Sequence, residues 1–86
     1  MIDLTLEDLK QSSAVVGMKE TQRAVEKKMA QCVFVASDCD EEIIQFLNNI
    51  CIQYGVPIIS SFTKKEIGRA CHIKVKASAC AVIDFR

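Results

Sequence analysis

The residues best suited to chemistry in this sequence form a short charged segment that follows a glycine. Residues 17–23 read Gly-Met-Lys-Glu-Thr-Gln-Arg and follow the apolar run 14–16. A glycine at a strand-to-helix junction lets backbone N–H groups approach an anion, and the start of the helix attracts phosphate. Lys19 and Arg23 lie one helical turn apart. Glu20 suits base reading, because a carboxylate accepts hydrogen bonds from nucleobase amino groups.

A second group of basic residues lies toward the C-terminus. Residues 64–69 hold three bases, and residues 72–76 read His-Ile-Lys-Val-Lys, in which apolar side chains alternate with cations. An exposed loop of this kind can pack Ile73 and Val75 on an unstacked base while the lysines contact the nucleic-acid backbone. A solvated helix face and an ordinary strand extension remain the alternatives for the first and second segments, respectively.

The cysteines and the single histidine make a weaker case for chemistry. The five cysteines show no Cys-x-x-Cys and no zinc-like spacing. Cys71 beside His72 is the one candidate for a nucleophile with its base, but adjacent residues of a helix point in different directions. Cys39 lies between two aspartates, whose charge disfavours its thiolate. We expect reduced thiols, with Cys32 and Cys80 in the core, and neither a metal site, a cofactor nor enzymatic activity.

The charges balance overall but are segregated along the chain. Lys plus Arg and Asp plus Glu each number 11, so the formal net charge is zero at pH 7. Residues 29–62 contain four acids and no base, whereas residues 63–86 contain six bases and two acids. Neutrality excludes a general polyanion binder, since nonspecific nucleic-acid binding needs a basic surplus, but it allows a selective one. The acidic run 38–42 fits a helix N-terminus better than a calcium loop.

Alternating strand and helix patterns predict the elements that position these segments. Strands are expected over residues 14–16, 32–36, 56–60 and 78–85. Helices are expected over residues 4–10, 17 to about 28, 38 to about 53, and 63 to about 71. The spacing of Met18, Thr21 and Val25 predicts that they face the core. This alternation indicates one α/β domain over residues 1–86.

Local signals mark where two of these helices begin or end. Asp38 with Glu41, and Thr63 with Glu66, have the spacing of a capping box. Gly55 predicts a helix end. No apolar run exceeds five residues, whereas a membrane-spanning helix needs about 20. The first residues begin acidic and lack the apolar core of a secretory signal, so we expect a cytoplasmic protein with no membrane contact.

The two basic segments, in their order along the chain, resemble motifs of the kink-turn-binding ribosomal-protein family. These are the large-subunit proteins L-seven-Ae and L-thirty-e, and the bacterial YbxF and YlxQ type is the most similar in length. The first family motif matches residues 17–23, and the later one matches residues 63–70 followed by 72–75. The stretch 33–38 resembles the family's valine–alanine–x–aspartate strand end, and Val56-Pro57 its valine–proline. The resemblance covers nearly the whole chain.

The resemblance implies a fold and a set of contacts. The implied fold is a three-layer α-β-α sandwich with a four-stranded mixed sheet, and the implied ligand is a kinked RNA helix with tandem sheared G·A pairs. The residues implied to contact RNA are Gly17, Lys19, Glu20, Arg23, Lys64, Ile73, Lys74 and Val75. Those of the 19–23 segment would contact guanine edges and nearby backbone, and residues 73–75 would cover the protruding nucleotide. His72 stands where glycine is usual in the family.

The leading hypothesis is therefore a non-catalytic RNA-binding protein that recognises a kink-turn or related internal loop. We expect it to associate with the ribosome and to use no small-molecule substrate. The two basic segments should meet on one surface, with the acidic segment facing away. The alternative is a protein-interaction module on the same fold, with weak or no RNA binding, that uses the acidic helix 38–53. A third hypothesis, a Cys71-dependent enzyme, predicts rapid alkylation of Cys71 near neutral pH.

Overall fold

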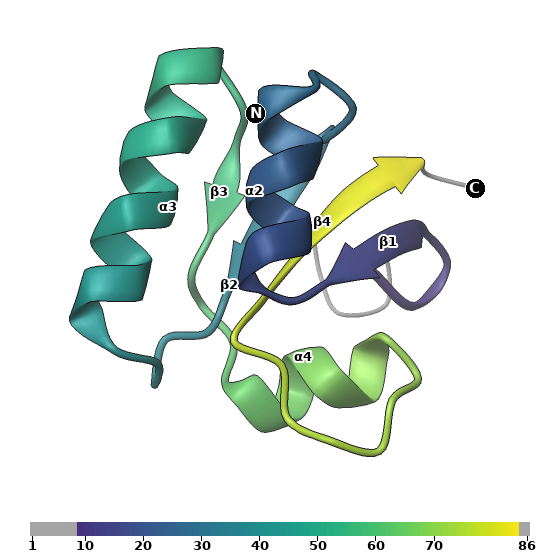
Figure 1. The fold of residues 1–86 in the computed structure, drawn as a ribbon. Coiled ribbons are helices and arrows are strands. Elements are labelled where there is room, and N and C mark those ends of the chain that lie inside the picture. Colours follow the sequence, from purple (N-terminus) through teal and green to yellow (C-terminus); the bar gives the residue numbers. More distant parts are fainter. Residues whose placement is uncertain (1–8, 85–86) are drawn as a thin grey trace.

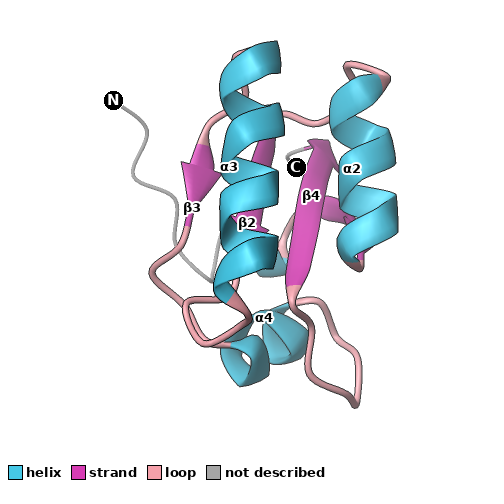
Figure 2. Cartoon of the chain, turned by 60° about the vertical axis from the view of Figure 1, so that its left-hand side comes forward, coloured by secondary structure: helices cyan, strands magenta, loops and turns pink. Residues whose placement is uncertain are grey.

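The structure is a computed structural model that describes residues 9–84. Its strands are β1 (Ser13–Val16), β2 (Cys32–Val35), β3 (Ile58–Ile59) and β4 (Ala79–Asp84). Its helices are α2 (Met18–Glu26), α3 (Glu41–Tyr54) and α4 (Lys64–Ala70). Figure 1 and Figure 2 show α2 and α3 side by side over one face of the sheet, with α4 apart from them. The expected three-layer α-β-α sandwich is confirmed.

The four strands form one mixed sheet in the order β1-β4-β2-β3. The last strand, β4, runs antiparallel to both of its neighbours, whereas β2 and β3 are parallel and joined through α3. Val16 pairs with Cys80, and Val35 pairs with Ala79. The start of β4 therefore lies between the ends of β1 and β2. The chain enters α2 directly after the end of β1.

Side-chain alternation along the two central strands divides the core into two layers. Cys32 and Phe34 of β2, with Cys80 and Val82 of β4, pack in a cluster that includes Ile67 of α4. The intervening residues of the same strands pack against α2 and α3, and these are Val33, Val35, Ala79 and Ala81. All eight strand residues are buried, because helices cover both faces of the sheet. The prediction of Cys32 and Cys80 as core residues is confirmed.

The predicted N-terminal cap of the acidic helix is wrong. Helix α3 begins after Asp40, whose side chain makes no capping hydrogen bond. Asp38 instead accepts a hydrogen bond of 2.9 Å from the backbone N–H of Lys64, the first residue of α4. That N–H has no partner within its own helix, so a carboxylate from a distant segment satisfies it. The capping box of Thr63 and Glu66 is confirmed, with both of its reciprocal hydrogen bonds formed.

Two further predictions of local structure need adjustment, and a third lies mostly outside the described residues. Thr21 and Val25 are buried as expected, but Met18 is 36% exposed because it lies at the first position of α2, before the helix covers the sheet. The strand predicted over 56–60 shortens to β3, since the N–H of Val56 closes the end of α3 on Cys51. Of the helix predicted over 4–10, only Leu9 and Lys10 are described. Both are helical, and Leu9 is buried.

Helices α2, α3 and α4 end in the same way, with the chain turning at a left-handed residue. These residues are Lys28 (φ 60°), Gly55 (φ 70°) and His72 (φ 62°). In α4 the N–H of His72 donates to the carbonyl of Arg69, and the N–H of Ile73 donates to that of Gly68, both at 3.1 Å. This pair of bonds is a Schellman motif, in which glycine is the usual left-handed residue. Only α3 uses glycine there.

Within residues 9–84, no helix has both the length and the apolar character needed to cross a membrane.

Replacing the left-handed residue of α2 by glycine should stabilise the protein. We expect Lys28→Gly to raise the free energy of unfolding by about 0.5–1 kcal/mol, because glycine adopts this conformation without the Cβ clash. His72→Gly should gain less, because its Nε2 donates a hydrogen bond of 3.2 Å to the carbonyl of Lys10, which glycine cannot make. Urea unfolding of both variants measures the difference. A less stable Lys28→Gly variant would contradict the assignment of strain.

Candidate nucleic-acid interface

The interface begins at Gly17, which joins β1 to α2. Its backbone has φ 108° and ψ 154°, a conformation that residues with a Cβ rarely adopt. Its N–H donates a hydrogen bond of 2.9 Å to the carbonyl of Ala79, the first residue of β4. A Cβ placed on Gly17 would meet no atom within 4 Å, so the start of α2 is open to an approaching ligand.

The charged residues predicted on α2 lie together on its exposed face. Lys19, Glu20 and Arg23 are all exposed. The Arg23 guanidinium lies 3.4 Å from Glu20 Oε1, and the two side chains are 60% and 50% exposed. An ion pair this exposed contributes little to stability. The contact places a carboxylate and a guanidinium next to each other beside the start of α2.

The second predicted segment is a loop that the backbone of α4 holds in place. The N–H of Ile73 donates to Gly68, and the N–H of Ala77 donates to the carbonyl of Lys64 at 3.2 Å. Between these two bonds the loop passes so close to α4 that a Cβ on Gly68 would collide with the carbonyl oxygen of Val75. Position 68 therefore requires glycine because the loop backbone at Val75 leaves no room for a Cβ, and not because of its φ, which is ordinary for a helix.

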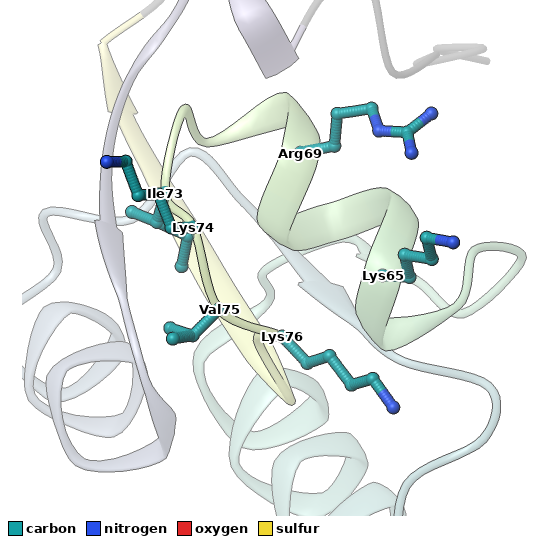
Figure 3. Close-up of a pocket in the computed structure, with 6 residues that line it drawn as sticks. All are labelled: Lys65, Arg69, Ile73, Lys74, Val75 and Lys76. Atoms are coloured by element: carbon teal, nitrogen blue, oxygen red, sulfur yellow. The ribbon is translucent and has the colours of Figure 1, made fainter.

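The loop presents its three predicted residues in different ways. Ile73 is half-buried and packs against the cluster that contains Ile67, whereas Lys74 is exposed and Val75 is 70% exposed. In Figure 3 the side chains of Lys74 and Val75 extend to the opposite side of the loop from those of α4. An apolar side chain exposed to this degree beside a lysine is suited to contact a base and its phosphate.

A groove with an excess of positive charge lies between α4 and the loop. It has a volume of about 460 Å³ and is lined by Lys65, Arg69, Ile73, Lys74, Val75 and Lys76. Figure 3 shows Lys65, Arg69 and Lys76 extending to the same side of the loop. We call these three residues the outer basic strip.

The residues of the outer basic strip are not among the eight that the resemblance implied to contact RNA, although the sequence had placed Lys76 in the exposed loop. Lys65 and Arg69 are one turn apart on α4, and that i, i+4 spacing was the available signal. Lys76 joins them only because the loop folds back along the helix. A second, smaller depression of about 290 Å³ adds Gln22 and Glu26 to Lys19 and Arg23 on α2.

The acidic segment does not face wholly away from the basic residues. Asp38 lies against the N-terminus of α4 through its bond to the Lys64 backbone, and Lys64 itself is half-buried. The expectation of separate acidic and basic faces therefore fails at this point, because the unpartnered N–H groups that begin α4 attract a carboxylate. Lys64, one of the residues predicted to contact RNA, therefore lies next to an acidic residue, Asp38.

Cys71 and His72 do not form a nucleophile–base pair. The ring of His72 is directed to the carbonyl of Lys10 instead of the Cys71 thiol. Burial raises the pKa of Cys39, and the neighbouring aspartates add a smaller effect in the same direction. Across residues 9–84 there is no group of three or more His, Cys, Asp or Glu side chains that could hold a metal ion.

The arrangement of β1, α2, α4 and the loop before β4 is that of a known family. The model of the ribosomal protein L7Ae/L30e/S12e/Gadd45 family matches residues 3–86. The chain belongs to this family. A curated relative, an RNA-binding protein of Geobacillus sp. (strain WCH70), is 37% identical over 75 residues, which make up 87% of this chain and 92% of the relative.

Solved structures agree with the family assignment. A 15.5-kDa RNA-binding protein of Giardia lamblia superposes with a TM-score of 0.83 and 28% identity, over 92% of this chain and 70% of that chain. A Bacillus halodurans protein of unknown function superposes with a TM-score of 0.80 and 22% identity, over 92% of this chain and 81% of its own. The second similarity concerns the fold alone.

Adding one methyl group at Gly68 should displace the interface loop. Alanine favours a helix over glycine by about 1 kcal/mol, so propensity alone would make Gly68→Ala stabilising. We expect instead a loss of about 1–3 kcal/mol in the free energy of unfolding, because the new Cβ overlaps the Val75 carbonyl. Gly55→Ala is the matched control, since its Cβ would meet open space and its cost of about 1 kcal/mol reflects backbone conformation alone. Equal or greater stability of Gly68→Ala in urea would refute the close approach.

Proposed function

We propose that this protein is a non-catalytic RNA-binding protein that recognises a kink-turn or a related internal loop. The observation that carries the proposal is the hydrogen bond from Gly17 to Ala79, which joins the start of α2 to the first residue of β4, directly after the loop. From this bond we infer that the two basic segments, more than 40 residues apart in the chain, form one RNA-binding surface. Membership of the family and the RNA-binding relative support the same conclusion.

The start of α2 would read bases. An RNA groove that approaches Gly17 meets no side chain there, so it can reach the exposed N-terminus of the helix. Glu20 would accept hydrogen bonds from guanine amino groups, while Lys19 and Arg23 reach base acceptors or phosphates. Arg23 and Glu20 lie side by side on the exposed face of α2, so one RNA could contact both.

The loop would hold the nucleotide that protrudes from a kinked helix. Exposed Val75, with half-buried Ile73 behind it, offers an apolar surface for an unstacked base, and Lys74 lies beside it. The two hydrogen bonds to α4 fix the loop in advance, which lowers the entropy lost on binding.

The outer basic strip would bind the RNA backbone. Lys65, Arg69 and Lys76 contribute three positive charges on one side of the loop, and the carboxylate of neighbouring Glu66 is engaged with Thr63. Phosphate contacts of this kind position an RNA without reading its sequence. A chain with no net charge could in this way present a locally basic surface. Association with the ribosome in the cytoplasm is part of the proposal.

The decisive experiment compares two RNAs in a gel-shift assay. One contains a kink-turn, and the other lacks its tandem G·A pairs. We expect the first to bind at least tenfold more tightly, because the base contacts need the intact pairs. Equal binding of both RNAs, or binding of neither, would refute kink-turn recognition. Binding that does not weaken between low and moderate salt would instead favour the protein-interaction alternative.

Two substitutions should separate base reading from backbone binding. Glu20→Ala is expected to reduce the preference for the intact kink-turn by about tenfold, since one base contact contributes about 1–3 kcal/mol of discrimination. Lys64→Ala should weaken all RNAs alike and lower the salt slope by about one. The two hydrogen bonds of Lys64 shown above use its backbone and survive the substitution. Glu42→Ala, an exposed acid of α3, is the control. Unchanged discrimination by Glu20→Ala would remove its assigned role.

A further inference from the structure

The outer basic strip lies on the opposite side of the loop from the residues assigned to the protruding nucleotide. The side chains of Lys65, Arg69 and Lys76 extend to one side of the loop that follows α4, as Figure 3 shows. Those of Lys74 and Val75 extend to the other side. The strip and the nucleotide-binding residues are therefore directed toward two different regions of space.

Backbone contacts bring the strip together from two segments of the chain. The N–H of Ala77 donates a hydrogen bond of 3.2 Å to the carbonyl of Lys64, which brings the neighbouring Lys76 and Lys65 together. Arg69 follows one turn later on α4. The three cations line one groove of about 460 Å³. Their relative position is therefore set by the fold before any ligand binds.

The charges of the strip are available to a ligand. All three side chains are exposed. Among residues 9–84, none of the three has a carboxylate oxygen within 4.0 Å, the limit for an ion pair. The adjacent acid on α4, Glu66, accepts hydrogen bonds from the N–H and the hydroxyl of Thr63 at 3.0 and 3.2 Å. A polyanion that binds the strip therefore displaces no ion pair.

We propose that the outer basic strip binds the backbone of a second RNA helix, so that the protein bridges a kinked RNA and a neighbouring helical segment. The inference rests on the proposed function and goes beyond it by assigning the strip to a different part of the RNA. None of the six residues that line the groove is aromatic, whereas sites for unpaired RNA stack bases on aromatic rings. Cations without such rings suit a paired backbone, whose phosphates they contact without reading bases.

Three cations bind RNA weakly by themselves but add to a contact that has already formed. Non-specific binding through phosphates has a Kd on the order of 10⁻⁴ M at physiological salt. When the second helix belongs to the same RNA as the kink-turn, its binding becomes intramolecular, with an effective concentration of about 1 mM. The strip should therefore increase affinity for a large folded RNA and contribute little to an isolated kink-turn.

The test compares two RNAs by fluorescence anisotropy. One is a kink-turn with a flexible single-stranded tail, and the other carries a plain duplex at the end of the same tail. We expect the second RNA to bind about tenfold more tightly. Lys65→Gln/Lys76→Gln should remove this gain, lower the salt slope for the second RNA by about two, and leave binding of the first unchanged. Lys27→Gln/Lys28→Gln removes the same charge from exposed residues after α2 and should behave as the parent.

The outcomes separate this inference from the proposed function. A tailed kink-turn that does not bind would refute kink-turn recognition, and salt-sensitive binding of the plain duplex, lost in the Lys65→Gln/Lys76→Gln variant, would still support a helix-binding strip. Equal binding of the two RNAs by the parent protein would overturn the inference. A double variant that weakens both RNAs alike would also overturn it. So would an oligoglutamate peptide that binds the strip more tightly than the plain duplex, since the partner would then be an acidic protein segment.

Discussion

The pairing of β4 with both β1 and β2 is the constraint on which the rest of the structure depends. Because β4 is the last strand and lies inside the sheet, its register places Ala79 beside the junction that opens α2. The Gly17 N–H completes that arrangement. Small side chains on β4, among them Ala79 and Ala81, let the helices approach the sheet closely. This strand therefore links the start of α2 to the end of the loop that follows α4.

The interface also contains several backbone positions that depart from local preference. Gly17 has a positive φ, His72 is left-handed without being glycine, and Gly68 allows a carbonyl to come close to a helix. Such departures from local preference persist only where surrounding hydrogen bonds determine them, and they gather at functional sites. Here the hydrogen bonds from Ile73 and Ala77 to α4 hold the loop backbone in its conformation. The strain is therefore consistent with a loop shaped in advance for a ligand.

Much of the fold was predictable because its signals are local. The capping box at Thr63 and the glycine stop at Gly55 are patterns within a few residues, and both are present. The wrong predictions have nonlocal causes. Asp38 had a capping box spacing, yet its carboxylate satisfies α4, which lies 26 residues away. Met18 had helical spacing, yet the first residue of α2 extends beyond the sheet.

The sequence by itself determined the alternation of strands and helices, the charged segment after Gly17 and the second basic segment near the C-terminus. Propensity, capping and periodicity act over one or two helical turns, so they are legible in a single chain. Only the tertiary structure decided that Lys76 joins Lys65 and Arg69, and that Asp38 borders Lys64. Those contacts arise from strand register and loop path. They depend on how distant segments pack together, which no local pattern encodes.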